Sequence, residues 1–483
     1  MSEPSRLQDT RKQGHWRKAG KLAAGALFDP PIQTRLFFRG IFLLLFVMTF
    51  LRLIFLLVNR GAFSGIGAAK LSLSFLNGLR FDLHMLLILF GLFFLFLHIP
   101  GRWKDQFPWV RHILWIPLAL FLPAVGLILF DVHYYADAGR HLSYEIFTVH
   151  SDRYDIVSTA GMASKYGWTI LFFAVLSAFL LFGWKKILGK APGGTKPAGI
   201  SPARKTLWMA FFLVFLLLGL RGTIKGRPLR MSDAFTQGRT ELGHLALNPL
   251  FTVWQSVLEE GREVTSFLPG DKAVENVRRL LGTPQTVWYG DETPLYRKKA
   301  VAEGSARKQV NVVFLTMESW SPRYLGAYGD DEGTTPEFDK LAADGLLFEN
   351  FYAVGNRTIE GLGAINLGIP GFNRSRGPTA GSFLSGSLEQ NNYRGIGHIL
   401  ADAGYTSVYM HGESSSNFRH ESLPTLAGFD KHLGRDELGL TPEDTSGPWG
   451  GWDHVLLDRL YDVARSEPEP FFTLWLSLTN HSP

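Results

Sequence analysis

Five apolar stretches in the first 220 residues constrain the fold of this 483-residue chain more than any other feature. A helix needs about 20 consecutive apolar residues to cross the hydrocarbon core of a bilayer. The stretches that reach or approach this length are Gly40 to Val58, Leu83 to Ile99, His112 to Phe130, Gly167 to Trp184 and Thr206 to Leu220. We therefore expect a transmembrane domain of five helices at residues 36–220, following a basic tail at residues 1–35.

The distribution of basic residues predicts the orientation of these helices. Lysine and arginine are concentrated in the tail, between residues 100 and 111, and between residues 185 and 205. Because loops with such an excess stay in the cytoplasm, the N-terminus is expected there. Five crossings then carry everything after Leu220 to the outside of the plasma (inner) membrane, whereas four or six would reverse this. The same loops explain the net charge of +6, so nucleic acid is not an expected partner.

Three charged residues in or beside the apolar stretches need an explanation, because charge at membrane depth is costly. They are Arg52 and the pair Arg80 and Asp82 at the start of the second stretch. One interpretation is snorkelling to the interface or a structural ion pair. The other is contact with a lipid headgroup.

The second half of the chain has the pattern of a water-soluble α/β domain. Residues 221–309 read as an extracytoplasmic linker with helices, including one at Asn248 to Glu260, and the domain itself is expected at residues 310–483. Short apolar strands that alternate with helices predict a parallel sheet. The expected strands are Val310 to Met317, Leu346 to Tyr352, Thr406 to Met410 and Phe471 to Leu478.

Polar residues follow three of these strands, at the edge where open α/β sheets bind ligands. The first strand ends at Glu318, the third at His411, and the fourth leads into His481. A carboxylate and two imidazoles at neighbouring strand ends could bind a metal ion or a phosphate group. Each histidine alone is more often a structural or surface residue. The chain has no cysteine, which excludes disulfides and cysteine-ligated metals.

Thr358 lies where a helix is expected to begin, after the segment Gly355 to Arg357. A hydroxyl group at this position is often simply an N-cap. The alternative is a nucleophile: a metal held by Glu318 would lower the pKa of the Thr358 hydroxyl, and the free N–H groups of the helix would stabilise a phosphoryl group.

Taken together, these residues resemble the lipoteichoic-acid-synthase-like branch of the alkaline phosphatase and sulfatase superfamily. The main motifs are Asn311-Val-Val-Phe-Leu-Thr-Met-Glu318-Ser319-Trp320, Asn356-Arg-Thr358 and Leu478-Thr-Asn480-His481-Ser-Pro483. Secondary signatures are Gly78-Leu-Arg80-Phe-Asp82, Leu247-Asn248-Pro249 and Trp449-Gly450-Gly-Trp-Asp453. The resemblance implies a five-helix transmembrane domain followed by an α/β sulfatase-like domain.

The resemblance also implies roles for individual residues. Glu318 would be a metal ligand, and Thr358 both a ligand and the nucleophile. The metal would be a single divalent ion, typically Mn²⁺ in this branch. His411 and His481 match histidines that contact the substrate phosphate, and Arg419 lies near the position of a family tryptophan and arginine pair.

One departure from the family concerns the remaining metal ligands. Members supply an Asp-His pair downstream of the segment that contains His481, but this sequence stops at Pro483. Asp453-His454 is not a substitute, because it precedes the last strand and opens an apparent helix. We therefore expect either a C-terminally truncated form of a longer protein or an incomplete, inactive site.

The resemblance implies transfer of a phosphoglycerol-type headgroup from a membrane phospholipid to an envelope glycan or lipid, through a phospho-threonine intermediate. The alternatives are a phosphoethanolamine transferase and a sulfatase-like hydrolase of the same superfamily. Phosphoethanolamine transferases usually carry disulfides, and sulfatases usually use a different nucleophile. A non-catalytic membrane sensor or scaffold is the alternative of another class.

Overall fold

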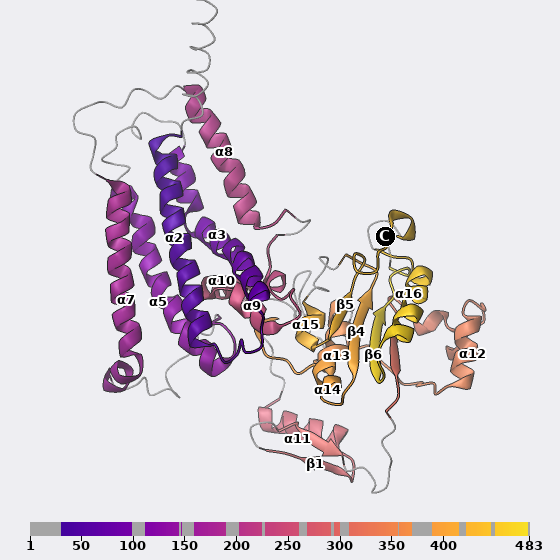
Figure 1. Ribbon diagram of the computed structural model, residues 1–483. Coiled ribbons are helices and arrows are strands. Elements are labelled where there is room, and N and C mark those ends of the chain that lie inside the picture. The colour runs from indigo at the N-terminus through magenta and orange to yellow at the C-terminus, as the bar shows by residue number, and fades with distance from the viewer. Residues whose placement is uncertain are drawn as a thin grey trace, which may run out of the picture. The chain divides into compact units, whose positions relative to one another are not determined.

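The computed structural model describes residues 30–98, 112–143, 146, 159–189, 202–224, 228–259, 268–290, 294–299, 309–355, 357–369, 389–414, 422–445 and 450–481. The chain divides into two compact units. The first comprises residues 1–258 with 386–392, and the second comprises residues 259–385 with 393–483 (Figure 1).

Long apolar helices make up most of the first unit. They are α2 (Ile32–Val58), α3 (Ala68–His98), α5 (Trp115–Ala138), α7 (Thr159–Leu188) and α8 (Pro202–Arg221). The first three and Tyr166–Leu188 of α7 are long and apolar enough to cross a membrane. The helix α8 carries Arg204, Lys205 and Arg221 at its ends, and its apolar middle is the fifth predicted stretch. The five expected helices are therefore all present, and this is a membrane protein.

Aromatic side chains hold three of these helices together. The ring of Phe37 in α2 lies 4.5 Å from that of Phe94 in α3 and 4.9 Å from that of Phe212 in α8, both edge to face. Leucines such as Leu92 and Leu217 point outward, 70% and 58% exposed. In a membrane, lipid covers such side chains, so their exposure is expected of a spanning helix.

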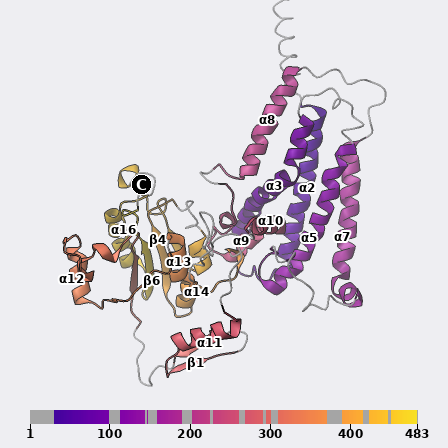
Figure 2. The same cartoon turned by 180° about the vertical axis from the view of Figure 1, so that it is seen from behind.

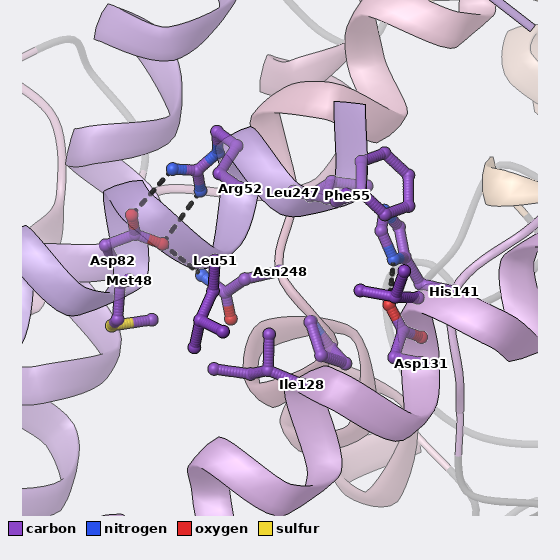
Figure 3. Close-up of a pocket in the computed structure, with 12 residues that line it drawn as sticks. Met48, Leu51, Arg52, Phe55, Asp82, Ile128, Asp131, His141, Leu247 and Asn248 are labelled. Carbon is purple, nitrogen blue, oxygen red and sulfur yellow. Dashed lines mark hydrogen bonds and ion pairs between the residues drawn. The ribbon is translucent and has the colours of Figure 1, made fainter. Parts of the chain in front are cut away.

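Short helices follow the membrane helices in the same unit: η2 (Met231–Ala234), α9 (Thr240–Ala246) and α10 (Pro249–Glu259). The last confirms the helix predicted at Asn248 to Glu260. Buried polar groups bind this segment to the membrane helices, as Figure 3 shows.

Arg52 and Asp82 form a buried, two-bonded ion pair between α2 and α3 (Figure 3). Arg52 Nη1 and Nη2 donate to the Asp82 carboxylate at 2.7 and 2.8 Å. Asn248 Nδ2 also donates to Asp82, at 2.8 Å, and Arg52 Nε donates to the carbonyl oxygen of Leu245 at 2.8 Å. The structure therefore favours a structural ion pair over contact with a lipid headgroup. The partner of Asp82 is Arg52 and not Arg80, because residues two apart on a helix do not face each other.

A second polar link connects α5 to α9. His141 Nδ1 lies 2.6 Å from Asp131 Oδ2, and His141 Nε2 lies 2.8 Å from the carbonyl oxygen of His244. A small cavity lies between the two links (Figure 3). The centre of a water molecule can occupy ≈ 20 Å³ of it, so the cavity has room for about one water molecule. The links stabilise the connection between membrane helices and the segment that follows them.

The second unit contains a four-stranded parallel sheet with the order β3-β6-β4-β5. The strands are β3 (Val312–Thr316), β4 (Thr406–His411), β5 (Lys431–Leu433) and β6 (Phe471–Leu476). A separate hairpin is formed by β1 (Thr286–Trp288) and β2 (Arg297–Lys299) after α11 (Gly270–Leu281). The expected parallel sheet is confirmed, with β5 as an additional strand.

Helices cover both faces of this sheet (Figures 1 and 2). They are α13 (Thr358–Leu367), α14 (Ile396–Ala401), α15 (Leu423–Ala427) and α16 (Asp453–Ser466). The helix α12 (Pro336–Asp344) contacts the short turn η4 (Gly326–Tyr328), and the other short turns are η3 (Pro322–Tyr324) and η6 (Pro442–Asp444). Met410 and Trp475 pack against Leu456 and Leu460 of α16. Tyr409 alternates to the opposite face, where its ring contacts Phe429.

The strand expected at Leu346 to Tyr352 does not form, so that prediction was wrong. These residues have no strand partner among the described residues, and Leu346, Phe351 and Tyr352 are 80%, 77% and 77% exposed. The apolar side chains suggested a strand, but pairing depends on a neighbour that local sequence does not reveal. The helix α12 begins after Thr335, with Pro336 as its first residue, and ends before Gly345, and these residue types favour a helix start and stop.

Candidate functional site

The carboxyl ends of the parallel strands bring the candidate residues to one edge of the sheet. Glu318 follows β3 by two residues, His411 is the last residue of β4, and His481 follows β6 by five residues. Since β6 pairs with both β3 and β4, the three strand ends are neighbours. The candidate residues therefore follow neighbouring strands at the predicted edge of the sheet.

Thr358 and Glu318 are in direct contact. The Thr358 hydroxyl donates to the Glu318 carboxylate, with Oγ1 3.0 Å from Oε1 and 2.9 Å from Oε2. The backbone N–H of Glu318 donates to Ser477 Oγ at 2.7 Å, which fixes the glutamate to the segment after β6. A carboxylate and a hydroxyl group from different strand connections are thus held next to each other.

Thr358 begins α13 but does not cap it. The N-cap position is Arg357, in extended conformation, and no side chain caps the helix. The Thr358 hydroxyl is directed at Glu318 instead, so the simple N-cap interpretation does not describe it. Because Thr358 is the first residue of the helix, it lies at the positive end of the helix dipole.

His411 is fully buried and hydrogen bonded through both ring nitrogens. Its Nδ1 accepts from the backbone N–H of Glu413 at 3.1 Å, and its Nε2 lies 2.9 Å from Nε2 of His432 in β5. The geometry assigns the proton of the His411–His432 contact to Nε2 of His411, because its Nδ1 is an acceptor. His432 is then the acceptor and must be neutral. Burial lowers the pKa of His432 to about 4, against an opposing effect of Glu437.

Glu413 is a further carboxylate at this edge of the sheet, and the sequence motifs did not indicate it. It is buried, and burial, followed by the negative charge of Glu318, raises the pKa of Glu413 to about 7. A glutamate with this pKa exchanges its proton near neutral pH. Its position two residues after the strand-end histidine was the only available signal.

Asp453 holds the segment that carries His481. Its carboxylate accepts from the backbone N–H groups of Leu478 and Thr479, at 2.7 and 3.1 Å. The N–H of Asp453 donates in turn to Thr479 Oγ1 at 2.9 Å. The prediction that Asp453 opens a helix is confirmed by α16. His481 itself is half-buried, and Arg419 lies outside the described residues.

The chemistry of this site partly fits a divalent metal ion. A carboxylate and a hydroxyl group are oxygen ligands of the kind that Mg²⁺ and Mn²⁺ prefer. Among the described residues, no group of three or more His, Asp or Glu is arranged to hold a metal ion. Glu318 and Thr358 would therefore supply only part of the ligands that a divalent ion needs.

The sulfatase family matches residues 310–483 of the chain. This range contains the whole four-stranded sheet and all five residues proposed for the site. The match covers the second unit's sheet and not the membrane helices.

Relatives extend the similarity beyond this domain. Lipoteichoic acid synthase 2 of Bacillus subtilis (strain 168) is 26% identical over 296 residues, 60% of this chain and 42% of the relative. Phosphoglycerol transferase I of Salmonella arizonae is 27% identical over 195 residues, 38% of this chain and 25% of the relative. The matched region thus spans less than half the length of either relative.

A solved structure from Vibrio parahaemolyticus, described as a protein in the alkaline phosphatase superfamily, aligns with 45% of this chain and 50% of its own. Its sequence identity is 24% and the TM-score is 0.37.

Proposed function

We propose that this chain transfers a phospholipid headgroup, because residues 310–483 match the sulfatase family and the chain is similar to a lipoteichoic acid synthase and a phosphoglycerol transferase. The headgroup is of the phosphoglycerol type. The donor is a membrane phospholipid, and the acceptor is a glycan or lipid of the cell envelope.

The contact between Thr358 and Glu318 carries this proposal. In the first step, Thr358 Oγ1 attacks the phosphorus atom of the donor, and its proton leaves toward the Glu318 carboxylate that it already hydrogen bonds. The bond from phosphorus to the diacylglycerol oxygen breaks, and diacylglycerol departs with a proton. In the second step, a hydroxyl group of the acceptor attacks the same phosphorus atom and returns the proton to Thr358.

The N-terminus of α13 would stabilise the negative charge of the phosphoryl group under attack. Thr358 is the first residue of α13, and a helix N-terminus attracts phosphate. We assign contact with the phosphate to His481 and Arg419 as well. His411 acts at this edge through its hydrogen bonds to Glu413 and His432.

Glu318 and Thr358 would also hold one divalent ion, Mn²⁺ in this proposal. Such an ion, when bound, lowers the pKa of a coordinated hydroxyl group and so makes Thr358 a better nucleophile.

The membrane helices anchor the chain in a bilayer, which supports a membrane lipid as the donor. We propose that the N-terminal tail lies in the cytoplasm and that the sulfatase-like domain lies outside the plasma membrane, as the distribution of lysine and arginine predicts. In this arrangement the donor headgroups and the Thr358 hydroxyl are on the same side of the bilayer.

The nearest alternative is transfer of phosphoethanolamine, which the same site would catalyse. The test is to place the full chain in lipid nanodiscs with Mn²⁺ and to supply phosphatidylglycerol or phosphatidylethanolamine, each labelled in the headgroup. Release of diacylglycerol from phosphatidylglycerol, with the label on an added acceptor, supports the proposal. Release from phosphatidylethanolamine alone supports the alternative. Label released to water shows a hydrolase, and no release from either lipid supports a non-catalytic sensor or scaffold.

A further inference from the structure

A groove of ≈ 470 Å³ lies among α2, α5 and α7 in the membrane unit. Its walls include Ile54 and Val58 of α2, Leu129 of α5, and Leu171 and Phe172 of α7. The volume is within the range of about 300–1,000 Å³ typical of sites for small organic ligands. We call it the α2–α5–α7 groove. All three helices are long and apolar enough to span a membrane, and they lie side by side in both views (Figures 1 and 2).

Polar and amphipathic side chains mark one end of this groove. His133 Nε2 lies 2.7 Å from Thr169 Oγ1, and both residues belong to the lining. Trp168, next to Thr169, is 84% exposed. Tryptophan at the end of an apolar span is typical of the interface between bilayer and water. The groove therefore has an apolar body and a polar end, as an amphiphilic ligand does.

The groove is shallow enough to fit within one leaflet of a bilayer. On α7 it extends from Trp168 to Val175, which at the rise of a helix is about 10 Å. The hydrocarbon core of a bilayer is ~30 Å thick, so the groove fits within half of it. The polar end lies near the C-terminal end of α2 and of α5 and toward the N-terminal end of α7.

We infer that the α2–α5–α7 groove binds an acyl chain of a glycerophospholipid, with the headgroup at the end marked by His133 and Thr169. A lipid is the occupant that matches an apolar groove with a polar end that fits within one leaflet. This inference rests on the proposed function for the identity of the lipid, which would be the donor. In the proposed orientation, the polar end is on the outer side, where the sulfatase-like domain also lies.

The test uses the full chain in nanodiscs of phosphatidylcholine that contain a trace of phosphatidylglycerol with a photoreactive group in one acyl chain. After irradiation, peptides that carry the lipid are identified by mass spectrometry. Cross-links are expected in the parts of α2, α5 and α7 that line the groove. Two adjacent residues of α7 provide matched variants: Leu171 lines the groove and is 52% exposed, whereas Ile170 does not line it and is 58% exposed.

Leu171→Trp fills the groove and is expected to reduce these cross-links about tenfold. Ile170→Trp places the same side chain in the surrounding lipid and is expected to leave them unchanged. Cross-links spread evenly over all membrane helices, or lost equally in both variants, would overturn the inference. So would a cross-link from these helices to another protein chain in place of the lipid.

Competition and activity separate this inference from the proposed function. Unlabelled phosphatidylglycerol should reduce the groove cross-links more than an equal amount of added phosphatidylcholine, and equal competition would overturn the assignment to the donor lipid. Thr358→Ala should stop headgroup transfer and leave the cross-links intact. If the unmodified chain forms the cross-links but transfers no headgroup, the groove is supported and the proposed function is contradicted.

Discussion

The hydroxyl group of Thr358 lies 3.0 and 2.9 Å from the two carboxylate oxygens of Glu318, although the residues are 40 positions apart in the sequence. One comes from the end of a strand and the other from the first turn of a helix. The fold therefore joins a candidate nucleophile to an acidic group that can hold a metal ion and accept a proton. The proposed mechanism depends on this contact.

Replacing Glu318 with glutamine should weaken metal binding and stop transfer, because a neutral amide is a poor ligand and a poor proton acceptor. The loss of Mn²⁺ affinity should exceed the about 10–100-fold cost of changes outside the coordination shell. Titration calorimetry of the full chain measures it. The control is Glu337→Gln, a surface glutamate that contacts Lys340. Equal Mn²⁺ affinity in both variants would show that Glu318 is not a ligand.

Removing the charge of Arg52 should strongly destabilise the membrane unit. In Arg52→Met the carboxylate of Asp82 stays buried without its partner, which costs about 3–5 kcal/mol. Arg52→Met combined with Asp82→Leu should recover most of this loss, because no isolated charge remains. Thermal unfolding in detergent micelles measures both, with the exposed Arg60→Met as the control. A single variant as stable as the control would show that the ion pair is not structural.

Acid should destabilise the sheet edge at His432. Its pKa is about 4 when folded and has a reference value of 6.5, so below pH 6.5 the unfolded chain binds a proton that the folded chain does not. This contribution to stability is complete above pH 6.5 and is lost progressively down to pH 4.

The test measures the midpoint temperature of thermal unfolding of the metal-free protein at several pH values from 7 to 4. A fall in this midpoint is the expected effect of His432. His432→Gln should show a shallower dependence on pH in this window. The exposed His454→Gln should follow the unmodified chain. Identical profiles for the two variants would rule out the assigned role of His432.

Asp453 should act by positioning the segment after β6. Asp453→Ala removes the acceptor of two backbone hydrogen bonds, and hydrogen bonds to a charged group contribute about 1.5–3 kcal/mol each. We expect a lower transfer rate with unchanged Mn²⁺ affinity, and partial rescue by Asp453→Asn. Asp462→Ala, an exposed residue of the same helix, is the control. A loss of Mn²⁺ affinity in Asp453→Ala would make Asp453 a ligand instead.

Local patterns in the sequence were sufficient to predict the elements that depend mainly on the residues within them. The apolar stretches predicted the membrane helices, and the short apolar strands that alternate with helices predicted a parallel sheet. Reading the residues after each strand placed Glu318 and His411 at one edge, because the ends of parallel strands meet there.

Features that depend on distant partners could not be predicted. The roles of Glu413 and His432 come from burial beside Glu318 and His411, which no local pattern encodes. The same holds for the partner of Asp82, which the helix packing supplies from α2. The failed strand at Leu346 to Tyr352 has the same cause, since an apolar segment becomes a strand only if a neighbour pairs with it.

The most direct measurement of the central claim is the covalent state of Thr358 during turnover. The full chain is incubated with Mn²⁺ and phosphatidylglycerol labelled in the headgroup, quenched in acid and digested, and its peptides are analysed by mass spectrometry. We predict a labelled phosphoglycerol group on the peptide that contains Thr358, and no transfer by Thr358→Ala. Continued release of diacylglycerol by Thr358→Ala, or turnover with this peptide never labelled, would contradict the account.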